Sequence, residues 1–230
     1  MDALRRPDAR IAAVAALEQP LRRRLYDLLV ERAGWVGRDD AAAALGVPRS
    51  VAAFHLDKLA ALGVVEVGYE RAAGRTGPGA GRPAKRYRLT ADEVGASVPD
   101  RRYDLAGRLL ADAVAAATEH GEPVGEALTR GARALGLEIG RSVADADDLT
   151  GRRAVIDALI EHGYRPCAGD DDVVLENCPF HRLAERHREL ICGMNLDLLR
   201  GVIDGIGVSS TYRATLVPEP GRCCVRLDRV

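Results

Sequence analysis

The chain has 230 residues, and its 33 basic and 34 acidic residues give a formal net charge of -1. This balance excludes a protein that binds polyanions by overall charge, so any contact with nucleic acid must come from a local basic patch. No apolar run approaches the roughly 20 residues that cross a bilayer. We therefore expect a cytoplasmic protein with no membrane partner, of a length that suits two modest domains.

Residues 10–17 and 21–32 are predicted helices, separated by Gln19-Pro20, because proline is well tolerated at the first position of a helix. Residues 41–45 form a short helix that ends at a glycine-containing turn. A longer helix follows over residues 49–62. A short helix, a tight turn and a second helix of three turns are typical of the helix-turn-helix motif.

The face of helix 49–62 opposite its leucines carries small and polar residues around Phe54. An apolar side chain there suits a helix in the major groove, where it can contact thymine methyl groups. Arg49 and Ser50, at the start of the helix, are placed to reach phosphates or base edges.

Two alternating segments, residues 64–69 and 86–89, are predicted to pair as a hairpin. The glycine-rich loop between them is strongly basic and can follow a DNA backbone or enter a minor groove. The predicted DNA-contacting residues are Arg49, Ser50, Ala53, Phe54, Lys58, Arg75, Arg82, Lys85 and Arg86. A protein-interaction module with the same elements is the alternative.

The order of these elements resembles the ArsR-type regulators over residues 10–90. The stretch RSVAAFHLDKL at residues 49–59, followed by Gly63-Val64-Val65, is similar to the recognition helix and first wing strand of that family. The resemblance implies a winged helix-turn-helix that binds a double-stranded DNA operator.

A long helix is predicted from residue 100 to residue 120, with many small residues along it. It either packs between two subunits of a homodimer, which would match two DNA half-sites, or packs inside its own chain. Further helices are expected over residues 122–143 and 152–162, with an acidic turn at residues 145–148. The predicted domains are a DNA-binding domain at 1–96, a dimerisation helix or linker at 97–122 and a cysteine-containing sensor domain at 123–230.

The C-terminal part contains two predicted hairpins, residues 164–167 with 173–176 and residues 211–217 with 223–227. The predicted fold class is therefore α+β: an N-terminal winged helix-turn-helix domain and a C-terminal helical domain with a small antiparallel sheet.

Four of the five cysteines follow residue 177: Cys178 in a Cys-Pro-Phe-His corner, Cys192 in a helical run, and the pair Cys223-Cys224 at the last strand. Thiolates suit zinc, copper(I) and iron-sulfur centres, and a shared metal is a common reason for distant cysteines to converge. Packing as small buried residues is the alternative. Strand alternation places Cys223 inward and Cys224 outward.

This combination of a winged helix with the Cys-Pro-Phe-His corner, the run Cys192-Gly193-Met194-Asn195 and a terminal cysteine strand resembles the SufR-type regulators. The resemblance implies a homodimeric repressor whose cysteines hold a 4Fe-4S or 2Fe-2S cluster. The implied ligands are Cys178, Cys192 and one of Cys223 and Cys224, with His181 a candidate for the fourth place. The cysteine intervals are longer than those of the family, which suggests a relative that senses another signal.

Three functions follow as hypotheses. The first is a transcriptional regulator controlled by an iron-sulfur cluster; the second is a regulator that senses zinc or thiol redox state. The third is a regulator that responds to a small organic ligand while the cysteines only pack. We do not expect an enzyme, because the sequence has no phosphate-binding loop, Ser/His/Asp arrangement or metallohydrolase motif.

Overall fold

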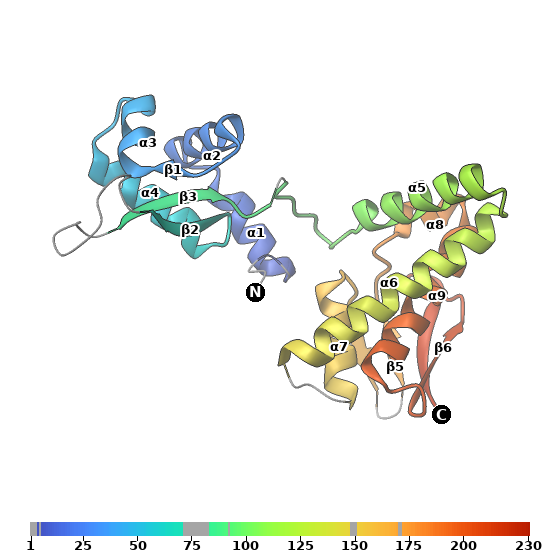
Figure 1. Ribbon diagram of the computed structural model, residues 1–230. Coiled ribbons are helices and arrows are strands. Elements are labelled where there is room, and N and C mark those ends of the chain that lie inside the picture. The colour runs from blue at the N-terminus through green and yellow to red at the C-terminus, as the bar shows by residue number, and fades with distance from the viewer. Residues whose placement is uncertain (1–3, 5, 71–82, 92, 148–150, 170–171) are drawn as a thin grey trace. The chain divides into compact units, whose positions relative to one another are not determined.

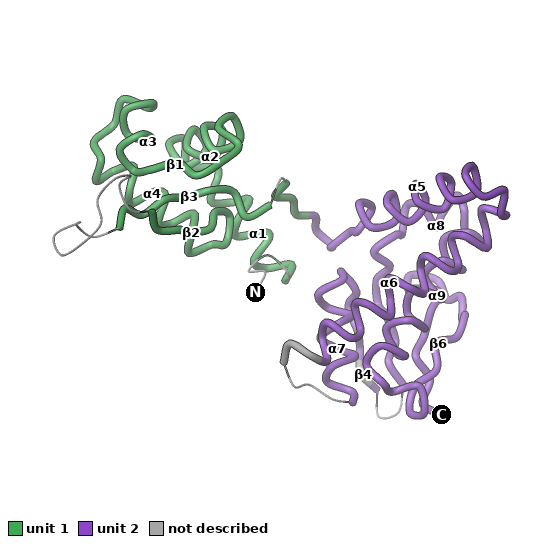
Figure 2. Tube along the Cα trace, in the orientation of Figure 1, with its two compact units in different colours: residues 1–96 green, residues 97–230 purple. Residues whose placement is uncertain are grey.

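The computed structural model describes residues 4, 6–70, 83–91, 93–147, 151–169 and 172–230 (Figure 1). The chain divides into two compact units, residues 1–96 and residues 97–230 (Figure 2). Both units combine helices with a small antiparallel sheet, so the α+β class predicted from the sequence is confirmed. Among the described residues, no helix is both long enough and apolar enough to cross a membrane.

The first unit contains four helices and a three-stranded sheet among its described residues. In chain order these are α1 (Pro7–Ala16), α2 (Pro20–Arg32), β1 (Val36–Gly37), α3 (Arg38–Leu45), α4 (Arg49–Ala61), β2 (Val65–Glu70) and β3 (Ala84–Leu89). The strand order is β1-β3-β2, with every pair antiparallel. Gly46, at a φ of 65°, ends α3 in the left-handed conformation that glycine adopts without strain.

The core of the first unit is formed by apolar side chains from its helices and strands. The completely or almost completely buried side chains include Leu25, Leu29, Leu56, Leu59 and Tyr87. These residues come from α2, α4 and β3, so burial of their surface fixes α4 against the sheet. The opposite face of α4 is left to solvent.

The second unit contains five helices and a four-stranded sheet among its described residues. They are α5 (Tyr103–His120), α6 (Val124–Asp147), α7 (Gly151–Glu161), β4 (Pro166–Ala168), β5 (Val173–Leu175), α8 (His181–Arg186), α9 (Arg188–Ile206), β6 (Tyr212–Leu216) and β7 (Val225–Arg229). The strand order is β4-β5-β7-β6, again antiparallel.

Helices α6 and α9 cross with their backbones in direct contact, and glycine makes this possible. A methyl group on Gly136 would lie 2.0 Å from the carbonyl oxygen of Leu198, and one on Gly201 would lie 2.2 Å from the carbonyl oxygen of Arg133. Gly140 and Gly205 repeat the contact one turn further along. This crossing fixes α9, the helix that carries Cys192, against α6.

Several details differ from the sequence predictions. Residues 145–147, expected in an acidic turn, belong to α6, which runs unbroken from residue 124, because the helical pattern continues through them. The short strand β1 was not predicted, and Cys223 and Cys224 precede β7 instead of beginning it.

Helix α5 belongs to the second unit, where it packs on α6. Leu105, Leu109 and Ala113 are buried within the chain, while Val114 remains 54% exposed. The buried face is therefore that of an intrachain core helix.

Candidate functional site

Four cysteine side chains from three segments of the second unit meet beside its sheet. Cys178 follows β5, Cys192 lies in the first turns of α9, and Cys223 and Cys224 lie just before β7. The backbone N–H of Cys223 donates to the carbonyl oxygen of Leu175 at 2.9 Å, so the last cysteines are joined to the end of the strand that leads to Cys178. Cys178, Cys192 and Cys223 are buried, whereas Cys224 is half-buried.

The four thiols lie as two neighbouring pairs, and each pair affects the pKa values of its members. Cys223 donates its S–H to Cys178; this bond lowers the pKa of Cys178 and, together with burial, raises the pKa of Cys223 well above its usual range. Burial, followed by a hydrogen bond to Cys224, raises the pKa of Cys192 to about 12. Cys178 also acts electrostatically on Cys192, and Cys224 on Cys223, so the two pairs are neighbours within one cluster.

The pKa of Cys178 is lowered, whereas those of Cys192 and Cys223 are raised, so Cys178 ionises more readily than these two thiols. After the bond from Cys223, the backbone N–H of Phe180 and the positive charge of Arg101 also lower its pKa, against the opposing effect of burial. Arg101 further donates from Nη1 to the backbone carbonyl oxygen of Cys178 at 3.0 Å. Stabilised thiolates are the form in which cysteine binds metals.

A buried asparagine contacts the cluster from α9. Asn195 is 1% exposed, and its Nδ2 donates to the sulfur of Cys223 at 3.2 Å. The hydroxyl of Tyr164, itself buried, donates to Oδ1 of Asn195. In the sequence, Asn195 stands out only as part of the run from Cys192, and Tyr164 carries no local signal of a role at this site.

His181, the candidate for the fourth ligand, and Cys167, the fifth cysteine, have other surroundings. The Nε2 of His181 lies 3.3 Å from Oε1 of Glu185, and its side chain is 52% exposed, so the ring faces a carboxylate and solvent. Cys167 is exposed on the edge strand β4.

The donor set fits a soft metal or an iron-sulfur cluster in chemistry and burial. Four thiols can supply a complete tetrahedral set, and thiolates are the usual ligands of both zinc and iron-sulfur centres. Within the described residues, no three His, Cys, Asp or Glu side chains already stand in metal-holding geometry. Binding of a metal would require loss of the S–H protons, because thiolates are the form in which cysteine binds metals.

A second candidate site lies on the first unit, along the solvent face of α4. Ser50, Phe54 and Lys58 follow one another at helical spacing and are exposed, with Phe54 55% exposed. The Nζ of Lys58 lies 5.8 Å from the centre of the Phe54 ring. Ala53 is half-buried beside them, and Arg49 begins the helix.

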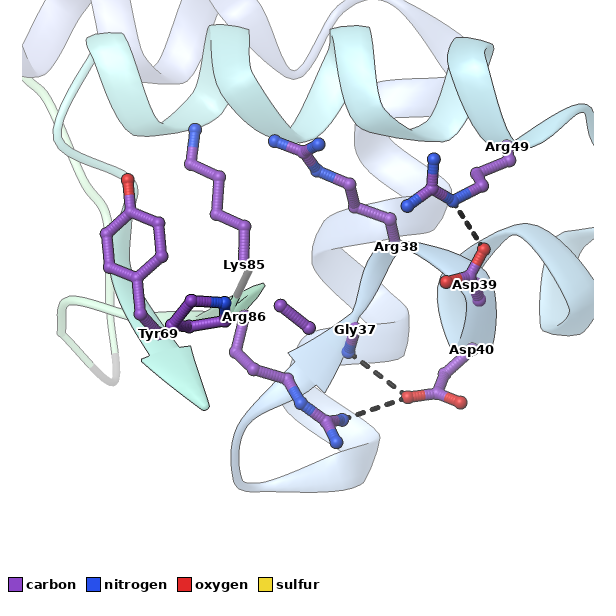
Figure 3. Close-up of a pocket in the computed structure, with 10 residues that line it drawn as sticks. Gly37, Arg38, Asp39, Asp40, Arg49, Tyr69, Lys85 and Arg86 are labelled. Atoms are coloured by element: carbon purple, nitrogen blue, oxygen red, sulfur yellow. Dashed lines mark hydrogen bonds and ion pairs between the residues drawn. The ribbon is translucent and has the colours of Figure 1, made fainter. Parts of the chain in front are cut away.

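Between the start of α4 and β3 lies an open pocket of about 630 Å³ (Figure 3). Its lining includes the cations Arg38, Arg49, Lys85 and Arg86. Two acids compensate part of this charge: Arg49 pairs with Asp39 at 2.6 Å, and Arg86 pairs with Asp40 at 3.1 Å. Arg86 also pairs with Glu70 at 2.9 Å.

Lys85 and Arg38 point towards α4 (Figure 3). Both form ion pairs with Asp57 of that helix. The hydroxyl of Tyr87 donates to Asp57 at 2.6 Å and accepts from Nε of Arg38 at 3.0 Å. This network joins α4 to β3, so Lys85 has a structural partner in addition to its expected role toward DNA. Arg75 and Arg82 lie outside the described residues.

Comparison of the chain with protein-family models, with curated proteins and with solved structures found no match.

Proposed function

We propose that this protein is a DNA-binding transcriptional regulator, acting as a homodimeric repressor, whose second unit binds an iron-sulfur cluster through Cys178, Cys192, Cys223 and Cys224. The proposed sensing function of the second unit is supported by one observation: four mostly buried thiols converge from three distant segments. Three of these thiols are buried and one is half-buried, and such a set of neighbouring sulfurs suits a shared inorganic centre.

The DNA-binding half is supported by the order of elements in the first unit. A helix, a glycine turn and a longer helix are followed by two paired strands, and this order favours a winged helix. The exposed face of α4 presents Ser50, Phe54 and Lys58, and Arg49 stands at its start. In this proposal α4 enters the major groove, where Phe54 contacts a thymine methyl group and the basic side chains contact phosphates.

Control of DNA affinity follows from linkage. If the cluster binds one arrangement of the dimer more tightly than another, its presence shifts the population towards that arrangement and changes the affinity for DNA. The cluster supplies a redox-active, oxygen-labile centre. The chain supplies thiolates, an apolar enclosure and donors to sulfur.

The test of the sensing half is anaerobic purification with absorption spectroscopy and with iron and sulfide analysis. We expect brown protein with iron and sulfide in equal amounts, and loss of the visible absorption in a Cys192→Ser variant. Colourless anaerobic protein that carries stoichiometric zinc would contradict the cluster and support a zinc-based sensor.

The DNA-binding half is tested by selecting bound duplexes from a random-sequence pool with the anaerobic protein. The enriched sequence should contain two symmetric half-sites. Phe54→Ala and Lys58→Ala should weaken binding to it, whereas Val30→Ala, which shortens another exposed apolar side chain of the first unit, should not. Absence of any enriched sequence would contradict this half of the proposal.

A second candidate, a thiol-redox sensor, is favoured by the direct hydrogen bond between Cys178 and Cys223. Oxidation by a hydroperoxide would form a disulfide between them. The two thiols lose two electrons and two protons, and the hydroperoxide is reduced to an alcohol and water. Mass spectrometry after brief peroxide treatment of metal-free protein should then find this disulfide and no sulfonic acid.

A further inference from the structure

The buried amide of Asn195 is hydrogen-bonded at both of its ends. The hydroxyl of Tyr164 donates to Asn195, and only the amide oxygen can accept that bond. The amide nitrogen is the end that faces Cys223, and its Nδ2 donates to the sulfur at 3.2 Å.

The position of Asn195 on α9 directs its side chain to the thiol cluster. Asn195 lies three residues after Cys192 in α9, so both project from the same side of the helix. Among the described residues, Asn195 is the one buried residue of the polar and charged types. A buried amide is costly unless its groups are bonded, and here one partner is a proposed ligand sulfur.

We propose that Asn195, oriented by Tyr164, is a positioning residue that donates an N–H···S hydrogen bond to the metal-bound thiolate of Cys223. The proposal rests on the proposed function, since it requires an inorganic centre at the thiols. A donor to a ligand sulfur fixes the side chain and stabilises charge on sulfur in a low dielectric. In an iron-sulfur protein the same bond raises the reduction potential, because the reduced centre carries more negative charge.

The experiment uses ¹¹³Cd²⁺ alone as a soft-metal probe, added to the metal-free full-length protein under anaerobic conditions. Binding is followed by the cadmium-thiolate absorption and by nuclear magnetic resonance. We expect a scalar coupling between ¹¹³Cd and a side-chain amide proton of Asn195, transmitted through the sulfur of Cys223. We also expect Asn195→Leu to bind the ion at least about tenfold more weakly.

Two further variants separate the hydrogen bond from packing. Tyr164→Phe should reduce the affinity less than Asn195→Leu does, because the amide keeps its donor and loses only its orientation. Tyr212→Phe, which removes a hydroxyl from another buried tyrosine of the same core, should leave the affinity unchanged.

The failures of the two proposals are distinguishable. If the wild-type protein does not bind ¹¹³Cd²⁺, the proposed metal site itself is overturned, and this inference with it. If the wild-type protein binds the ion but shows no coupling to Asn195, or if Asn195→Leu binds within twofold of wild type, only the role of Asn195 is overturned. The coupling is measured on unaltered protein, so a variant that fails to fold does not remove the test.

Discussion

Arg101 donates a hydrogen bond to the backbone of Cys178 at 3.0 Å and thereby joins the thiol cluster to the segment that enters the second unit. The division between the two units falls between Ala96 and Ser97, only a few residues before Arg101. The backbone N–H of Arg102 adds a second bond, to the carbonyl oxygen of Pro179 at 3.1 Å. The connecting segment is therefore attached to the corner that carries the first proposed ligand.

We predict that Arg101→Ala weakens the coupling between the cluster and DNA while the second unit remains folded. Allosteric coupling free energies of about 1–3 kcal/mol correspond to affinity ratios of about 5 to 150 between the two states. In the variant this ratio should fall toward one, measured as the DNA affinity of loaded and empty protein. Arg108→Ala, which removes an exposed arginine from α5, is the control and should keep the wild-type ratio.

The crossing of α6 and α9 gives a prediction about stability. Gly136→Ala would place a methyl group against the backbone of α9, where neither helix can yield locally. We expect a loss of about 3 kcal/mol in the free energy of unfolding, at the upper end of overpacking effects. Urea unfolding followed by far-ultraviolet circular dichroism measures it.

Gly131→Ala, in the same helix, is the matched control for Gly136→Ala. Its added methyl group would meet only Leu109, at 3.9 Å, which is an ordinary contact. The gain in helix propensity should then stabilise the protein by up to about 1 kcal/mol. Equal effects of the two substitutions would contradict the close crossing.

The sequence predicts features that depend on neighbouring residues, such as helix positions and which face of a helix is buried. The spacing of Leu56 and Leu59 indicates the buried face of α4, and both side chains are buried. Cys223 is buried as expected, but it precedes β7, so strand alternation is not the reason. The two structural networks were missed because their partners are distant in sequence. Tyr164 and Asn195 are 31 residues apart, and Lys85 and Asp57 are 28 apart. Such contacts depend on how elements pack, and neither residue of a pair carries a local signal for the other.

The two terminal cysteines should contribute unequally to metal binding. Cys223 is 5% exposed and receives the bond from Asn195, whereas Cys224 is half-buried. We predict that Cys223→Ser abolishes retention of the inorganic centre, because an enclosed ligand is lost and water cannot easily replace it. Cys224→Ser should retain the centre with faster loss, measured as release of metal to a chelator. The reverse order would assign the main ligand role to Cys224.

The network around Asp57 predicts the acid sensitivity of the first unit. Burial acts to raise the pKa of Asp57, but the hydrogen bonds from Lys85 and Tyr87 and the charge of Arg38 outweigh it, so the pKa is lowered. A carboxylate with a lowered pKa stabilises the fold above its unfolded pKa of about 4, and this contribution is lost as the pH falls through the folded pKa. Asp57→Asn should therefore lower stability at pH 7, and its difference from wild type should shrink below about pH 4.

Trp35, the only tryptophan of the chain, lies in the first unit, so its fluorescence reports the unfolding of that unit in the full-length protein. Its ring contacts β2 at Gly68, where an added methyl group would lie 2.7 Å from it, and Arg88 lies 4.6 Å from the ring centre. The fluorescence midpoint in urea should fall in Asp57→Asn at pH 7. Asp27→Asn, which breaks an exposed ion pair with Arg23, should change it little. A midpoint difference between Asp57→Asn and wild type that stays constant from pH 7 to pH 3 would show that the carboxylate charge does not hold α4 to β3.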